Sequence, residues 1–479
     1  MKPVGLIADL KSVASMRRSR TPPRRRTTTV ETLVLVACLL LTVPSTLNGS
    51  GGAVVADRRR GRGGSIAPPG LLARVPCPDQ SCRCRLTKLG DPIARCRGIP
   101  SAASSDVVYA EVVVKGTNIT RLQAFSFTNL TVRSLDLSGN HLSGSDAVDV
   151  NAFDGLETTL EVLAMSGCGL TCLPSEPLSR LCRLQILRLE ANAITDVPAR
   201  VLSECGSSLR ELYVYRNLII NVDTDAFVGL SGLEKLSLAE NRIETLPAGL
   251  FATLMNLTSL DLAHNRISRL SDGWLDGLSR LRWLQLDSNR LVELGPDTFR
   301  GASALRAMRV ENNPLTTIGR RTFRPIRRLD YLSIDLSRVT PLSRRTLAGL
   351  RRLKTLSLGE IGHSNLPDRV FSGARRLKYL SLSNFDGVLD ANAALRPSLF
   401  NRRFRFRHLN VWLQPMRQCR CTEPWIRALG ALGTYVHGYC SDERPLSCPA
   451  PGKKLRSSEN SGRRRVASMS AANAWRRLR

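Results

Sequence analysis

The feature that most constrains this fold is a repeat with a period of 24 residues. The stretch LSLAENRIETLPAGLF begins at Leu236, and LDLAHNRISRLSDGWL begins at Leu260 with apolar residues at the same offsets. A fixed period of this size predicts stacked structural units. The second apolar residue of each unit marks twelve strands, at steps that vary at first and equal 24 from Val214 onward: Val114, Leu137, Met165, Leu189, Val214, Leu238, Leu262, Leu286, Val310, Ile334, Leu358 and Leu382.

Each unit follows the pattern LxxLxLxxNxLxxLxxxxFxxLxx, which resembles the leucine-rich repeat family over roughly residues 107–413, with a thirteenth, partial strand centred on Leu409 and Val411. In LxL the two leucines lie on one side of a short strand, and the residue between them faces the other way. One unit cannot bury its leucines alone, so neighbouring units stack into a parallel sheet. The resemblance implies an α/β solenoid, curved as a horseshoe, with this sheet on its concave side.

A polar position follows most strands. A buried amide is tolerated there only if it forms hydrogen bonds with backbone groups of adjacent turns, so we predict a structural ladder of asparagines. The ladder comprises Asn140, Asn192, Asn217, Asn241, Asn265, Asn289 and Asn313. It should be weaker in the repeats that place Thr117, Cys168, Ser337 and Ile361 at this position.

Residues 1–56 are predicted to form a secretory signal with a long basic lead. Basic residues cluster from Arg17 to Arg26, and an apolar run follows from Leu33 to Val43. The run is about eleven residues long, which is short for a membrane span. We therefore expect a secreted, extracellular protein, the alternative being a single-pass membrane protein with an uncleaved N-terminal anchor. Residues 57–75 are predicted to be a basic flexible linker, and 451–479 a basic disordered tail.

The 13 cysteines also indicate an oxidising compartment. The family resemblance implies a cysteine cap at each end of the repeats, over residues 76–106 and 414–450. The implied disulfides are Cys77–Cys84, Cys82–Cys96, Cys419–Cys440 and Cys421–Cys448. A zinc site at these cysteines is disfavoured, because it needs a reducing context and other spacings.

A middle group of cysteines lies within the repeats, and its pairing stays open at this point. Cys168 occupies an asparagine position and Cys205 a leucine position, so each is a candidate buried free thiol. Cys172 and Cys182 lie outside strict core positions and are a candidate disulfide pair.

The sequence shows no catalytic constellation. It has no HExxH, P-loop or GxSxG motif, and its five histidines are scattered. We therefore expect no enzymatic activity, no cofactor and no metal site. Function is expected to reside on broad surfaces, chiefly the concave face of the sheet.

The concave face is predicted to bind a protein ligand. Asp287, Glu311 and Asp335 fall on three successive strands, about 4.8 Å apart, and Arg309 in the adjacent column is expected to offset their repulsion. Exposed aromatic side chains commonly anchor interfaces. Those predicted to point into the concavity are Tyr213, Tyr215, Trp283, Tyr331, Tyr379 and Trp412. The alternative is that they only pack on neighbouring side chains.

Positive charge gathers elsewhere. The net charge is +30, and residues 320–420 hold 22 Lys or Arg against 6 Asp or Glu. Arginines recur every 24 residues in two columns. The first column contains Arg320, Arg321, Arg344, Arg345 and Arg369, and the second contains Arg327, Arg328, Arg351, Arg352, Arg375 and Arg376. Because arginine suits bidentate contact with sulfate, a secreted chain of this kind is predicted to bind heparan sulfate or a similar glycosaminoglycan, and not nucleic acid. The alternative is a solvated face without a partner.

Three predicted N-glycosylation sites follow the predicted signal, at Asn118, Asn129 and Asn256. The leucine-rich repeat proteins that the chain resembles include small leucine-rich proteoglycans, Slit, acid-labile-subunit-like proteins and Toll-like receptor ectodomains. The sequence thus predicts an extracellular protein-binding or adhesion module. The alternatives are a glycosaminoglycan-binding matrix protein and a receptor ectodomain whose anchor is missing from this sequence.

Overall fold

In the computed structural model, the described residues all lie within Thr46–Arg479. The residues described are 75, 77–101, 107–202, 204–359, 366–383, 397–399, 409–416, 427, 430, 434–440 and 445–448. The predicted signal and tail, and all but the last residue of the predicted linker, lie outside them. Among these residues, no helix has the length and apolar character needed to cross a membrane.

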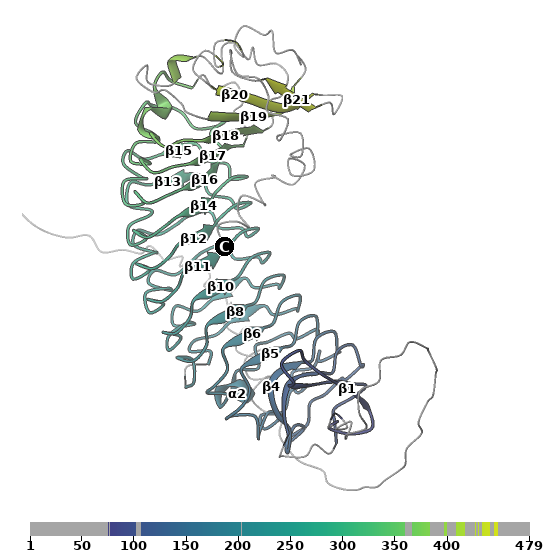
Figure 1. Ribbon diagram of the computed structural model, residues 1–479. Coiled ribbons are helices and arrows are strands. Elements are labelled where there is room, and N and C mark those ends of the chain that lie inside the picture. The colour runs from purple at the N-terminus through teal and green to yellow at the C-terminus, as the bar shows by residue number, and fades with distance from the viewer. Residues whose placement is uncertain are drawn as a thin grey trace, which may run out of the picture. The chain divides into compact units, whose positions relative to one another are not determined.

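A sheet of 17 strands runs through the described residues (Figure 1). Its neighbours pair in parallel along the repeats, and the β1–β2 and β20–β21 pairs are antiparallel hairpins. The strands are β1 (Cys82–Leu86), β2 (Pro92–Cys96), β3 (Val108–Val113), β4 (Thr131–Asp136), β5 (Val162–Ala164), β6 (Ile186–Arg188), β8 (Glu211–Tyr213), β10 (Lys235–Ser237), β11 (Ser259–Asp261), β12 (Trp283–Gln285), β14 (Ala307–Arg309), β16 (Tyr331–Ile334), β17 (Thr355–Leu358), β18 (Tyr379–Ser383), β19 (Leu409–Met416), β20 (Thr434–Cys440) and β21 (Pro445–Cys448).

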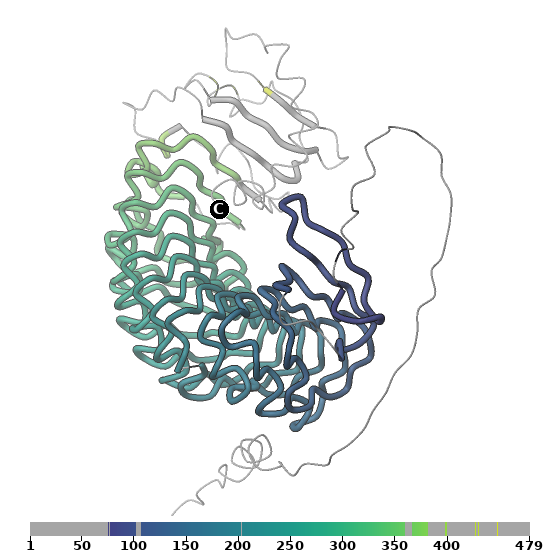
Figure 2. Tube along the Cα trace, turned by 60° about the horizontal axis from the view of Figure 1, so that its bottom comes forward, coloured from purple at the N-terminus to yellow at the C-terminus, as the bar shows by residue number. Residues whose placement is uncertain are grey.

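The register of this sheet follows the sequence period. Leu236 of β10 pairs with Leu212 of β8 on one side and with Leu260 of β11 on the other. Equivalent residues of successive turns therefore lie side by side. Figure 2 shows the turns stacked one on the next. The predicted leucine-rich repeat solenoid with a long parallel sheet is confirmed.

The segments that return from one strand to the next consist mainly of turns. The helices with described bounds are α2 (Ser175–Ser179) and the short 3-10 helices η1 (Val370–Gly373) and η2 (Pro397–Leu399), and the described residues Arg427 and Gly430 are also helical. Two additional two-stranded sheets pair β7 (Asp196–Val197) with β9 (Asn221–Val222) and β13 (Glu293–Leu294) with β15 (Thr317–Ile318). Close stacking requires glycine in places. Gly301 has φ +92°, and a Cβ there would overlap the carbonyl oxygen of Leu275 on the preceding turn.

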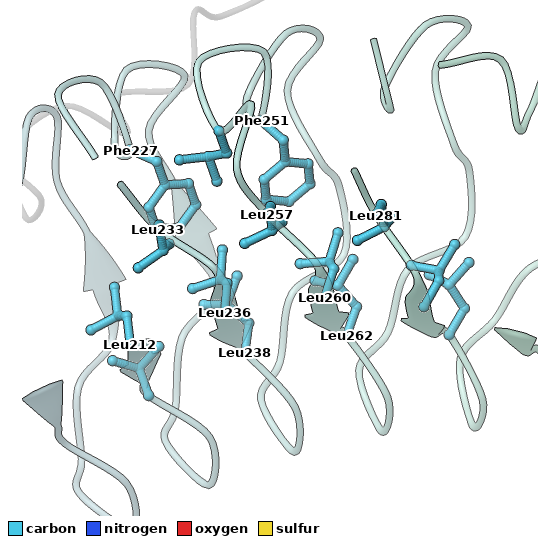
Figure 3. Packing of buried hydrophobic residues seen from close by; sticks show 14 of the residues in the cluster. Leu212, Phe227, Leu233, Leu236, Leu238, Phe251, Leu257, Leu260, Leu262 and Leu281 are labelled. Atoms are coloured by element: carbon cyan, nitrogen blue, oxygen red, sulfur yellow. The ribbon is translucent and has the colours of Figure 1, made fainter. Parts of the chain in front are cut away.

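The core is a continuous row of leucines with a row of aromatic rings behind it (Figure 3). Leu238, Leu262, Leu286, Ile334 and Leu358 are all 0% exposed. Phe227 and Phe251 stack with ring centroids 6.0 Å apart, and Trp274 meets Phe251 edge-on at 6.4 Å. The sequence pattern did not single out Trp274. Its buried indole N–H is satisfied because it donates to the carbonyl oxygen of Thr298 at 2.8 Å.

The asparagine ladder forms as predicted. The Asn265 amide donates to the carbonyl oxygens of Leu238 and Leu262 at 2.9 and 3.2 Å, and accepts from the backbone N–H of Ile243 at 3.1 Å. Each asparagine therefore joins two consecutive turns. Cys168 replaces this amide only in part, through a thiol that donates to the carbonyl oxygen of Leu137 at 3.2 Å. At Ser337, no side-chain hydrogen bond to another described residue occurs.

Two disulfides hold the N-terminal cap together. They join Cys77 to Cys84 and Cys82 to Cys96, which are the pairs that the resemblance implied. Cys448 is also disulfide-bonded. Cys419, Cys421 and the side chain of Cys440 lie outside the described residues, so the two C-terminal pairings stay predictions.

The middle cysteines pair differently from the candidate arrangement. Cys182 bonds to Cys205, so the candidate pair of Cys172 with Cys182 is wrong, and Cys172 is disulfide-bonded as well. Cys182 and Cys205 are 23 residues apart, which is nearly one repeat, and stacking brings their Cα atoms to 4.4 Å. Of the two candidate free thiols, Cys168 is free and buried. Burial raises the pKa of its thiol, which keeps it protonated and unreactive.

Candidate functional site

One face of the parallel sheet packs on the leucine core, and the opposite face carries the side chains that alternate with the buried leucines. We call this opposite face, which the sequence predicts to be the concave one, the outer face. Parallel register aligns them in columns along the stacked strands. One column brings Trp283 of β12, Ala307 of β14 and Tyr331 of β16 side by side. Tyr331 is only 1% exposed and packs on Ala307, with the half-buried Trp283 against them. The prediction that Tyr331 is an exposed anchor is therefore wrong, because the small Ala307 leaves space that its larger neighbours cover.

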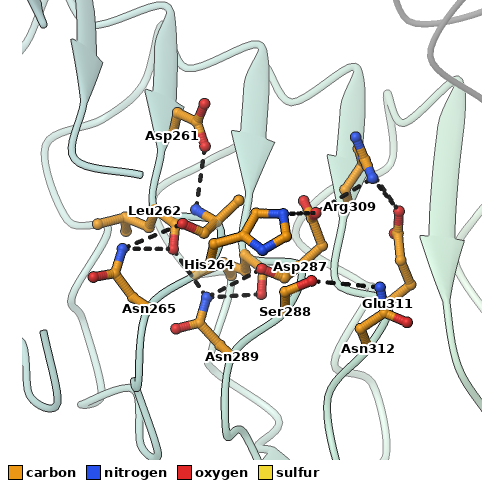
Figure 4. A network of polar contacts seen from close by, with 12 residues as sticks. Asp261, Leu262, His264, Asn265, Asp287, Ser288, Asn289, Arg309, Glu311 and Asn312 are labelled. Carbon is orange, nitrogen blue, oxygen red and sulfur yellow. Dashed lines mark hydrogen bonds and ion pairs between the residues drawn. The ribbon is translucent and has the colours of Figure 1, made fainter. Parts of the chain in front are cut away.

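A second column places acidic residues just beyond the same strands. Arg309 lies between them, with Nη2 at 3.3 Å from Asp287 Oδ2 and 2.7 Å from Glu311 Oε1 (Figure 4). Arg309 therefore offsets the repulsion between these carboxylates, as expected from the sequence. His264, at the end of β11, also approaches, with Nε2 at 4.0 Å from the same Asp287 oxygen. Two carboxylates share one guanidinium, so the cluster keeps an excess of negative charge.

Burial dominates the electrostatics of this cluster. The Asp287 side chain is 4% exposed, and desolvation raises the pKa of its carboxyl group although Arg309 acts in the opposite direction. Desolvation also raises the pKa of Tyr331 to about 12, so its phenol stays neutral. The side chains of Asp287 and Tyr331 are therefore more buried than the sequence pattern suggested.

Asp335, the third acidic residue of the strip, is held in another way. It is 9% exposed, and its carboxylate accepts a hydrogen bond from the backbone N–H of Asn312. Gly359 follows it in the same column, and a Cβ at Gly359 would overlap the Asp335 carboxylate. The missing side chain therefore provides the space in which this carboxylate lies.

Three buried polar atoms of this region have no hydrogen-bond partner among the described residues. They are Trp283 Nε1, Asp287 Oδ1 and Glu311 Oε2. Buried polar groups are normally satisfied, so such a concentration marks a place where an additional partner is favourable. We refer to Trp283, Asp287, Arg309, Glu311 and Tyr331 together as the β12–β16 patch.

The other predicted aromatic anchors differ in accessibility. Tyr213 is half-buried, its hydroxyl donates to Glu211 Oε2 at 2.7 Å, and the Arg188 guanidinium lies 5.0 Å from its ring centroid. Tyr215 is half-buried, while Tyr379 is 41% exposed. The side chain of Trp412 lies outside the described residues. Tyr379 and Tyr215 thus offer more accessible surface than Tyr331.

The predicted arginine columns are all exposed on the turn segments. The predicted glycosylation sites Asn118 and Asn129 are exposed as well. Asn256 is half-buried, because its amide donates to the carbonyl oxygen of Ser231 at 2.9 Å and accepts from Arg280 Nη1 at 2.7 Å. In the part of the chain that the structure describes, no group of His, Cys, Asp or Glu is arranged to hold a metal ion.

The "Leucine rich repeat" family model matches residues 182–243, 207–267, 231–291 and 279–335, and a second leucine-rich repeat model matches 128–149. This is a leucine-rich repeat protein with disulfides at its N-terminal end. The matches cover the strands that form the centre of the sheet, including β10, β11 and β12.

Two curated relatives match part of this chain. Human "Leucine-rich repeat-containing G-protein coupled receptor 6" is 35% identical over 95 residues, which are 19% of this chain and 10% of the relative. "Oplophorus-luciferin 2-monooxygenase non-catalytic subunit" from Oplophorus gracilirostris is 32% identical over 116 residues, 24% of this chain and 29% of the relative. The chain thus spans less than a third of either relative.

Among solved structures, the chain is similar to Toll in the Drosophila Toll–Spatzle complex. The TM-score is 0.53 at 17% identity, covering 75% of this chain and 53% of that chain. At this identity, the likeness concerns the leucine-rich repeat fold alone.

Proposed function

We propose that this leucine-rich repeat protein is an extracellular binding module that engages a protein ligand through the outer face of its sheet. Repeat solenoids use such extended faces for binding. Disulfides in the cap and in the repeats support an oxidising, extracellular compartment. The similar fold of Toll, whose solved structure is a complex with Spatzle, supports a protein as the class of ligand.

The β12–β16 patch is the observation that carries this proposal. It combines an aromatic ring at the surface with buried donor and acceptor atoms that lack partners among the described residues. Protein interfaces concentrate their binding energy in such places, where an aromatic anchor lies beside groups that become desolvated. The patch is also locally acidic in a chain with a net charge of +30. A ligand that presents a basic or hydrogen-bonding side chain beside an apolar one fits this surface.

The test uses the chain secreted by animal cells and screened against extracellular proteins. For a ligand found in this way, Trp283→Ala and Tyr215→Ala should each weaken binding by about tenfold or more, roughly 1.4 kcal/mol. Met255→Ala is the matched control, because Met255 is 61% exposed and lies on a turn segment away from the strands. Tyr331→Ala is unsuitable, since its burial makes loss of folding the expected result.

Two results would contradict the proposal. One is a ligand whose affinity is unchanged by both outer-face substitutions but falls with Met255→Ala. The other is a chain that stays inside the cell with free thiols at Cys82 and Cys96, because the extracellular assignment depends on these disulfides.

A further inference from the structure

The two arginine columns lie on the segments that connect the later strands. In each repeat, the two columns bracket a short stretch that buries core side chains, such as Phe323 and Ile326. The parallel register of β16, β17 and β18 places equivalent residues on successive turns. Arginines of one column therefore follow each other along the stacking direction, separated by at least the roughly 4.8 Å between paired strands.

The arginines of these columns have no acidic partners among the described residues. Basic side chains of earlier repeats commonly do: Arg216 pairs with Glu240 at 2.9 Å, and Arg300 pairs with Asp276 at 2.9 Å, each across one turn. Every arginine of the two columns is exposed, and none forms an ion pair with a described residue. Apart from the Nε–H of Arg327, which donates to the carbonyl oxygen of Arg324 at 3.2 Å, their guanidinium donors are therefore available to a partner.

Charge reverses at equivalent positions of the repeat. Two residues before the buried aromatic position, earlier repeats carry Asp225 and Asp297, whereas later repeats carry Arg321, Arg345 and Arg369. Gly249, at this position of another repeat, has φ +77°, close to the +72° of Arg321, so the backbone there does not require an arginine. Stacked like charges repel each other and oppose folding. A row of arginines is thus unfavourable for the isolated chain and becomes favourable when a polyanion neutralises it.

We propose that the two arginine columns bind a linear sulfated polysaccharide that runs along the stacking direction of the repeats. The guanidinium group presents parallel N–H donors that match the oxygens of a sulfate group, and the columns offer them at regular intervals. The disulfides Cys82–Cys96 and Cys182–Cys205 indicate an extracellular compartment. There, sulfated polysaccharides are more available than nucleic acid. This surface is separate from the outer face of the sheet and does not depend on a protein ligand there.

The experiment measures the binding of the full chain to heparin as a function of salt. The test variant changes Arg321, Arg345, Arg352 and Arg376 to Glu. Its matched control changes four exposed arginines of the earlier repeats to Glu, namely Arg133, Arg183, Arg242 and Arg290. Both variants have the same net charge, so bulk electrostatics affects them equally.

We expect the test variant to bind heparin about a hundredfold more weakly and with a shallower dependence on salt, because fewer counterions are released when fewer anionic groups are neutralised. The control should bind nearly as the native chain does. Changing the same four arginines to Lys should give an intermediate affinity, since charge remains but bidentate contact is lost. If the Glu variant does not fold, the Gln variant of the same residues takes its place.

Three results would overturn the proposal. Equal weakening of the test and control variants would show that net charge alone attracts heparin. Loss of binding on removal of the residues after Lys454, with the test variant unaffected, would place the site in the C-terminal segment. Tighter binding of the native chain to single-stranded DNA than to heparin at the same salt, with the same loss in the test variant, would assign the columns to nucleic acid.

Discussion

The earlier and later repeats of this protein share one core but differ in their turns and surfaces. Leu260 in the earlier repeats and Leu356 in the later ones occupy the same position of the repeat, are both 0% exposed, and each pairs in parallel with the equivalent leucine of a neighbouring strand. The earlier repeats add an asparagine to the turn of nearly every unit, as Asn265 illustrates. The later repeats place Ser337 at that position. Stacking by leucine is therefore compatible with two kinds of turn.

The surfaces of the two regions differ even more. Residues 107–319 hold 19 Lys or Arg against 24 Asp or Glu, whereas residues 320–420 hold 22 against 6. Charges in the earlier repeats neutralise one another across turns, for example Lys235 with Glu211 at 2.8 Å. Because the buried leucines define the fold in both regions, the surface charge can vary without changing the architecture. Under the two proposals above, each surface has the charge that its partner requires.

The largest expected effect tests whether the core is equivalent in the two regions. Leu260→Ala and Leu356→Ala should each lower the free energy of unfolding by about 2–5 kcal/mol, because each removes a fully buried side chain and leaves a cavity. Urea unfolding followed by circular dichroism measures both. A large effect at Leu260 with none at Leu356 would show that the cores of the two regions are not equivalent.

A smaller effect is expected at the turns, where the regions differ. Asn265→Ala removes the partner of the Leu238 and Leu262 carbonyl oxygens and of the Ile243 N–H, and should cost about 1–3 kcal/mol. Ser337→Ala, at the equivalent position, should change stability by no more than about 0.5 kcal/mol. If Asn265→Ala and Ser337→Ala lower the free energy of unfolding equally in the same assay, the asparagine ladder does not distinguish the earlier from the later repeats.

The smallest expected effect is a pH dependence at Asp287, a buried carboxyl group of the earlier repeats. Burial raises the pKa of Asp287 above its ordinary value of 3.8, so the folded chain holds this proton more tightly than the unfolded chain. The stability that protonation contributes is present below the ordinary pKa and is lost as the pH rises through the raised one. Between about pH 4 and pH 7, Asp287→Asn should therefore lose less stability than the native chain.

Thermal unfolding at both pH values measures this difference. Asp297→Asn is the control, since Asp297 is an exposed carboxylate on a turn segment. If the thermal stability of the native chain and that of Asp287→Asn change identically with pH, the pKa of the Asp287 carboxyl group is not raised in the folded chain.

Periodicity in the sequence was sufficient to predict which residues line up. The step of 24 from Val214 onward predicts the pairing of Leu236 with Leu260, and it locates the asparagine ladder and the arginine columns. These features depend only on a residue's place within its repeat. The hydrogen bonds of a buried asparagine amide with the backbone, for example, follow from its position within the repeat.

Only the tertiary structure decided how neighbouring columns fill the space between them. Tyr331 is buried because Ala307 beside it is small, and the Asp335 carboxylate occupies the space left by Gly359. The Cys182–Cys205 disulfide likewise joins residues on different turns. The signals were present in the sequence as small residues and as a spacing of nearly one repeat. Their outcome depends on the sizes and directions of side chains that meet only after the turns stack, because packing between turns is a property of pairs and not of single positions.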